Sequence, residues 1–234
     1  MFMFYIPAEE LSAMDVIVIP VAHVSEESSR VVREAIEREK PDVVAVELDM
    51  GRFQAMMSQA KPRMRDFLLN PFLGLIYIFQ QAFGKGLGVV PGSEMLAAVQ
   101  TAQKHGVPVA FVDRPLAITA NRLAHIPLSE KLNIAMQMLL TPLAFIPNPF
   151  SKRKPFNPDM LTDPALIEEV MKEFRKHLPH TYKVLVDERD DYMFGLVSRL
   201  DAQRVVLVVG AGHVAGISRR AALFGEPAEK GLAS

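Results

Sequence analysis

The 234-residue sequence contains no cysteine, which excludes disulfide bonds and any zinc site built on thiolates. It also has almost no net charge, and the formal value of −1 at pH 7 argues against a nucleic-acid partner. A basic region of the kind that opens a signal peptide is missing at the N-terminus, where Glu9 and Glu10 soon follow. These absences together favour a cytoplasmic protein.

Long uninterrupted apolar runs are lacking as well. Residues 67–84 and 132–151 approach the length of a membrane span without any charged residue, but both contain asparagine, glutamine and proline. A spanning helix needs about 20 mostly apolar residues. We expect these segments to cover the core, a dimer interface or a membrane-surface patch, which predicts a homo-oligomer, such as a homodimer, and peripheral membrane contact.

Four short apolar runs have the length and composition of buried strands: residues 16–19, 43–48, 109–112 and 205–209. A helical pattern lies between the first two runs, and strand–helix–strand predicts a parallel pair with a right-handed crossover. We therefore predict an α/β fold in which helices flank a central, largely parallel sheet. The prediction is one domain over residues 1–234, with apolar helical insertions at about 53–92 and 127–160.

Capping signals place several helices. Ser93 is predicted to cap a helix over residues 94–105, and Gly106 to end it. Thr162 or Asp163 is predicted to cap a second helix, which has Pro164 in its first turn and runs to about Leu178. A third is predicted to cover roughly residues 181–200.

Polar side chains follow the predicted strands at their carboxyl ends, where open parallel α/β sheets bind ligands. These residues are His23, Glu47, Asp113, Arg114 and His213. Glu47 lies in an otherwise apolar run, where a carboxylate is costly unless it is paired or bound to a metal. Two imidazoles and a carboxylate are a ligand set for zinc, manganese or iron. Without a metal, the same groups suit general acid–base hydrolysis.

Arginines near the same strand ends have both functional and purely structural interpretations. Arg52, Arg114 and Arg189 are suited to hold a carboxylate or an oxyanion. An ion pair between Glu47 and one of the first two arginines would serve stability alone. By default, the charged residues 188–191 are interpreted as the solvated face of a helix.

Several spaced motifs resemble those of the TraB/PrgY family, also called the pheromone-shutdown family. The matching stretches are residues 22–25, 41–49 with Arg52, 91–95, 112–114, 187–190 and 209–217. They occur in the family's order and span nearly the whole chain. Residues 210–213 keep the second Gly-x-x-His motif of that family, whereas Pro20 replaces the glycine of the first.

The resemblance implies a relation to the Tiki proteases, the erythromycin esterases and the ChaN-like haem-uptake proteins, and so a metal-dependent hydrolase of peptide or ester bonds. In this hypothesis His23, Glu47 and His213 bind a divalent metal (manganese, cobalt or zinc) or activate water. The residues expected to bind substrate or orient the catalytic groups are Arg52, Glu94, Asp113, Arg114, Glu188 and Arg189. A second hypothesis is capture of a peptide or small anionic ligand without turnover. In a third hypothesis, the histidines and the ion pairs only stabilise the edge of the sheet.

Overall fold

The structure, a computed structural model, describes residues 4–6, 14–21, 26–58, 92–144 and 163–225. Within these ranges one sheet contains the strands β1 (Phe4–Ile6), β2 (Asp15–Val21), β3 (Val43–Val46), β4 (Val109–Phe111) and β5 (Arg204–Gly210). Their order across the sheet is β1-β2-β5-β3-β4, and all pairs are parallel except β1 with β2. The predicted largely parallel α/β fold is confirmed, although the sequence did not predict β1.

Strand β5 lies at the centre of the sheet. Its register places Val208 beside Ile19 of β2 and Val46 of β3. Residues 205–209 of β5 are completely buried because helices cover both faces of the sheet. A parallel strand of this kind needs apolar side chains in both directions, which explains its continuous valine-rich run.

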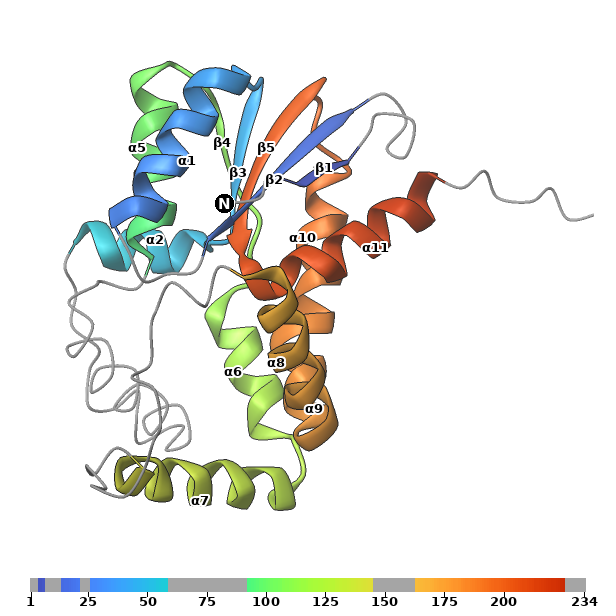
Figure 1. Cartoon of the computed structure of the whole chain (residues 1–234). Coiled ribbons are helices and arrows are strands. Elements are labelled where there is room, and N and C mark those ends of the chain that lie inside the picture. The colour runs from blue at the N-terminus through green and yellow to red at the C-terminus, as the bar shows by residue number, and fades with distance from the viewer. Residues whose placement is uncertain (1–3, 7–13, 22–25, 59–91, 145–162, 226–234) are drawn as a thin grey trace, which may run out of the picture.

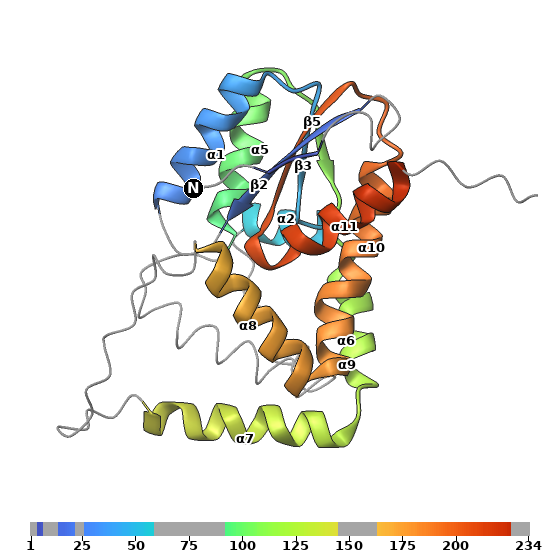
Figure 2. The ribbon, with the colours of Figure 1, turned by 45° about the vertical axis from the view of Figure 1, so that its right-hand side comes forward.

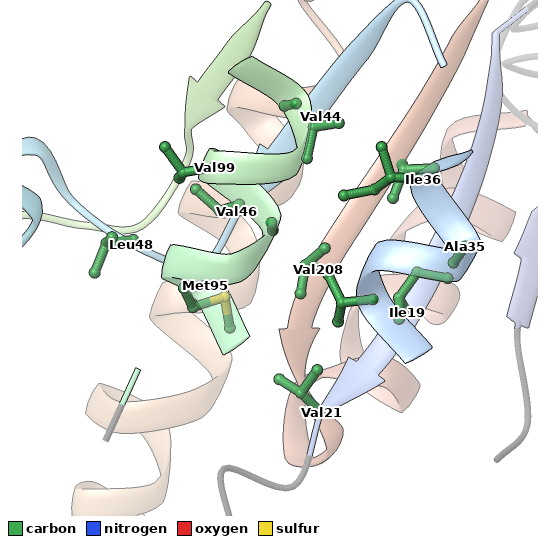
Figure 3. Close-up of a cluster of buried hydrophobic side chains, with 14 of the residues drawn as sticks. Ile19, Val21, Ala35, Ile36, Val44, Val46, Leu48, Met95, Val99 and Val208 are labelled. Carbon is green, nitrogen blue, oxygen red and sulfur yellow. The ribbon is translucent and has the colours of Figure 1, made fainter. Parts of the chain in front are cut away.

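Two helices, α1 (Glu26–Glu39) and α5 (Ser93–Lys104), cover one face of the sheet (Figure 1). Their apolar side chains point towards β2, β3 and β5 (Figure 3). The other face is covered by α10 (Glu188–Val197) and α11 (Val214–Gly225). Met193 and Ile217 are the buried anchors of these two helices, at 0% and 1% exposure.

The remaining helices extend from the carboxyl end of the sheet (Figure 2). They are α2 (Met50–Met57), α6 (Leu116–Ala124), α7 (Leu128–Ala144), α8 (Pro164–His177) and α9 (Pro179–Tyr182). Near the start of α7, Glu130 accepts hydrogen bonds of 2.7–2.9 Å from the backbone and side chains of His180 and Thr181. These bonds join α7 to the first turn of α9.

Two of the helix predictions differ from the structure in detail. Ser93 does not cap α5: it lies in the first turn, and Gly92, with φ 88°, is the cap residue. The helix predicted over roughly 181–200 is present from α9 to the end of α10, but it includes a π-helical turn, η3 (Lys183–Asp187), that the sequence did not predict. Asp163 does cap α8, accepting from the backbone N–H of Ala165 at 3.0 Å.

Among the described residues, none of the helices has both the length and the apolar character that crossing a membrane requires.

Candidate functional site

Glu47 follows β3 directly, at the carboxyl end of the sheet, and is buried. Its Oε2 accepts a 2.6 Å hydrogen bond from the backbone N–H of Gly210, the last residue of β5. Its Oε1 contacts Arg189 and lies 3.2 Å from Nε2 of His213. Burial alone would raise the pKa of Glu47, but the charges of His213 and Arg189 and these hydrogen bonds hold it well below its ordinary value.

Arg189, in the first turn of α10, bridges Glu47 to a second buried carboxylate. Its Nε and Nη2 donate to the two oxygens of Asp113, each at 2.9 Å, in the bidentate arrangement that arginine forms with carboxylates. Its Nη1 donates to the carbonyl of Leu185 in the π-helical turn at 3.2 Å. Asp113 follows β4 and also accepts from Nη1 of Arg52 at 3.1 Å.

His213 ends a single 3₁₀ turn, η4 (Ala211–His213), that follows β5. Its Nδ1 lies 2.6 Å from Oδ1 of Asp190, and because an ionised carboxylate only accepts, Nδ1 carries a hydrogen. Its Nε2 lies 3.2 Å from Glu47 and 3.1 Å from Nη1 of Arg189. A protonated ring therefore donates to Glu47 through Nε2, whereas a neutral ring accepts there from Arg189.

The two carboxylates favour the protonated ring. Burial alone would lower the pKa of His213, but the charge of Glu47 and the hydrogen bonds to Asp190 and Glu47 raise it to about 9. Asp190 is completely buried, and burial raises its pKa although His213 and Arg220 act in the opposite direction. At neutral pH His213 is thus an imidazolium between two acidic residues.

A second charged cluster adjoins the first. Nη1 of Arg114 donates to Glu188 at 2.7 Å, and its Nη2 donates to the carbonyl of Val184 in the π-helical turn at 2.8 Å. Arg122 of α6 donates to both oxygens of Glu188. These hydrogen bonds, led by those of Arg122 and opposed only by burial, lower the pKa of Glu188 to about 2.

Most of the predicted site residues come together at the carboxyl end of the sheet. The cluster contains Glu47, Arg52, Asp113, Arg114, Glu188, Arg189 and His213. Glu94 is completely buried in the first turn of α5, where Ser93 donates to it at 3.4 Å. His23 lies outside the described residues, so the predicted meeting of His23 with His213 is not tested.

Sequence reasoning missed Asp190, which it interpreted as part of a solvated helix face. The structure corrects this: Asp190 is completely buried and holds His213, while its neighbour Asp191 is exposed and pairs with Arg220. One feature of the sequence is consistent with a buried Asp190: residue 216, one helical turn beyond His213, is a glycine. A Cβ atom at position 216 would overlap the carboxylate of Asp190.

The predicted metal can be compared with the donors that the structure describes. Among these residues no three histidine, aspartate or glutamate side chains are grouped so as to hold a metal ion. Glu47 Oε1 and His213 Nε2 both face the guanidinium of Arg189, which would repel a divalent cation placed between them. The described donors therefore do not fit a resident metal in this arrangement, and His23, the third expected ligand, is not described.

The fold and the cluster define a class: a parallel α/β protein with a buried histidine–carboxylate–arginine network at the carboxyl ends of its strands. Residues 12–227 match the model of the TraB/PrgY/gumN family. The chain belongs to this family, as the sequence motifs predicted.

Relatives support this membership. The chain is 33% identical over 217 residues to the uncharacterized protein MJ1365 of Methanocaldococcus jannaschii, covering 88% of this chain and 53% of that protein. It is 27% identical over 242 residues to the TraB domain-containing protein of Homo sapiens, covering 87% of this chain and 62% of that protein. The mouse protein of the same name gives the same values. The chain thus spans just over half to about three-fifths of the length of these relatives.

Proposed function

We propose that this chain is a hydrolase of peptide or ester bonds in which His213 is the proton-transferring residue. The observation that carries the proposal is the position of His213: a buried imidazole held on one side by Asp190 and on the other by Glu47, at the end of a central parallel strand. Ligands bind at that edge in open α/β sheets, and a histidine with a displaced pKa there is a candidate acid or base.

Each residue of the cluster has a distinct task in this proposal. Asp190 fixes the ring through Nδ1, so that Nε2 carries the mobile proton. Water adds its oxygen to the acyl carbon, and the bond from this carbon to the leaving nitrogen or oxygen breaks as His213 gives its proton to the leaving atom. His213 then regains a proton from the water that has been added. Arg189, held by Asp113 and Glu47, supplies a fixed positive charge beside the ring for the oxyanion that develops.

The test is hydrolysis of a library of peptides and aryl esters by the full chain. Replacing His213 by glutamine removes the titrating group, and we expect turnover to fall by about 10²-fold or more. The matched control is His105→Gln, because His105 is an exposed histidine whose ring pairs with Glu37, outside the cluster. If the two variants retain equal turnover, His213 is not the proton-transferring residue.

Metal-dependent hydrolysis is the competing form of this proposal, with His23, Glu47 and His213 as ligands. It requires Arg189 to leave Glu47 and His213, since its guanidinium contacts both of the described ligand atoms. The full chain, stripped with a chelator and refilled with manganese, cobalt or zinc, distinguishes the two forms. Our proposal expects turnover to persist without metal. Near-stoichiometric metal uptake that His213→Gln abolishes, with activity restored only by the metal, would reject our proposal in favour of metal-dependent hydrolysis.

A second candidate is capture of a peptide or small ligand without turnover. The observation that favours it is the low pKa of Glu47, because a carboxylate already bonded to Gly210, Arg189 and His213 is a weak base. Saturable binding of a library member that is recovered intact after long incubation would support capture. Release of cleaved product at a rate that depends on His213 would exclude it.

A further inference from the structure

The arginines of the site differ in how far their guanidinium donors are already used. Arg189 places Nε and Nη2 on Asp113, and Arg122 places the same two atoms on Glu188. Arg114 uses Nε, Nη1 and Nη2 on Thr119, Glu188 and Val184. The hydrogen-bond donors of these three arginines are therefore largely used within the protein, although their charges remain.

Arg52 is different. It donates to Asp113 through Nη1 alone, and no other described residue accepts from its Nε or Nη2. Nε and Nη2 form the parallel pair of donors that binds a carboxylate side-on. In this structure Arg189 and Arg122 use that same pair to hold Asp113 and Glu188. Arg52 thus presents a copy of this carboxylate-binding edge that no described residue occupies.

Arg52 is also the most exposed residue of the cluster. The side chain of Arg52 is 40% exposed, whereas Asp113 beneath it is 3% exposed and Glu47 8% exposed. A ligand that reaches the guanidinium of Arg52 from solvent meets a positive charge, so an anionic group is favoured there and a cationic group is not. Asp113 accepts from both Arg52 and Arg189, and Arg189 contacts the ring of His213.

We propose that the Nε–Nη2 edge of Arg52 binds a carboxylate of the substrate, so that this site takes molecules with a free carboxylate near the bond to be cleaved. The inference rests on the site of the proposed hydrolase and names its substrate class. Arg52→Lys separates this role from simple attraction of charge, since lysine keeps the positive charge but lacks the planar pair of donors. Arg122→Lys is the matched control, because the same edge of Arg122 is already occupied by Glu188.

A direct test follows the Nε–H signal of Arg52 by ¹⁵N NMR while acetate is added to the full chain, with acetamide as the uncharged comparison. We expect a saturable shift of this signal with acetate and none with acetamide. The Arg122 signal should stay unchanged in both titrations. Absence of a saturable Arg52 shift with acetate would overturn the inference.

A second test measures equilibrium binding of N-acetylated tripeptides, each made as the free acid and as the C-terminal amide, to the full chain carrying His213→Gln. We expect the acids to bind at least about tenfold more tightly than the amides, and Arg52→Lys to abolish that preference while Arg122→Lys retains it. Equal binding of acids and amides, or a preference that survives Arg52→Lys, would overturn the inference. These measurements need no turnover. If the chain prefers acids but cleaves nothing, the proposed hydrolase activity is rejected while the carboxylate-binding role of Arg52 stands.

Discussion

The carboxylate of Asp190 occupies the space that a side chain at position 216 would need. A Cβ built on Gly216 would overlap Oδ2 of Asp190 and come within 3.3 Å of Nη1 of Arg220. Asp190 can therefore reach Nδ1 of His213 because position 216 of α11 is a glycine. The second Gly-x-x-His motif and the glycine that follows it thus act together on one histidine.

Replacing Gly216 by alanine tests this relationship. Alanine favours a helix by about 1 kcal/mol over glycine, but the overlap forces the carboxylate of Asp190 away from His213. We expect a net loss of about 1–3 kcal/mol in the free energy of unfolding, measured with urea. The control is Gly195→Ala in α10, where a Cβ meets no atom within 4 Å and the substitution should stabilise. Equal stabilisation by both substitutions would contradict the account.

The raised pKa of His213 predicts how stability depends on pH. The pKa is about 9 in the folded chain and near 6.5 when unfolded, so the protonated ring stabilises the fold fully below pH 6.5. This contribution, on the order of 3 kcal/mol, is lost as the pH rises through 9. The measurement is the difference in unfolding free energy between the wild type and His213→Gln at pH 6 and pH 10. The difference should shrink with rising pH; a constant difference would contradict the prediction.

Removing the charge of Glu47 should act on both of its partners. Glu47→Gln leaves the buried guanidinium of Arg189 with Asp113 alone, and breaking a buried pair in this way costs about 3–5 kcal/mol of unfolding free energy. It also removes the largest influence that raises the pKa of His213, which should fall towards its ordinary value. Urea unfolding and an NMR titration of the ring measure the two effects. Glu188→Gln, which changes a charge that does not contact His213, should leave the ring's pKa unchanged.

The connection between α7 and α9 should be independent of the site. Glu130 accepts from the backbone N–H groups of His180 and Thr181, so Glu130→Gln should weaken this cap by about 1–2 kcal/mol. Although burial raises the pKa of Glu130, these hydrogen bonds lower it to about 2. Its stabilising effect is then present above pH 4.5 and lost as the pH falls towards 2. Thermal unfolding between pH 2 and 7 checks this, and a change in the pKa of His213 would show that the two regions are coupled.

The sheet and much of the site were predictable because each depends on local pattern. The apolar runs at 16–19, 43–48, 109–112 and 205–209 mark β2, β3, β4 and β5, and all four strands are parallel. Parallel strands bring their carboxyl ends to one edge, so Glu47, Asp113 and His213 could be expected to meet there. Glu47 was the clearest signal, since a carboxylate in a buried strand run requires a partner.

The contribution of α10 could not be read from local pattern. A run of charges on a helix is usually solvated, and nothing within residues 188–191 distinguishes the buried Asp190 from the exposed Asp191. The π-helical turn before α10 sets which residues face the sheet, and its carbonyls at Val184, Leu185 and Asp187 each accept from an arginine. Two of these partners, Arg114 and Arg220, are distant in sequence, so the sequence does not reveal them before the fold is known.

The protonation state of His213 in the resting chain tests the central claim most directly. A ¹⁵N NMR titration of the imidazole should show hydrogen on both ring nitrogens at pH 7, with loss of the Nε2 proton only near pH 9. That result would establish the ring as a proton donor between Asp190 and Glu47. A ring that loses its proton at or below its ordinary pKa of 6.5 would contradict the account.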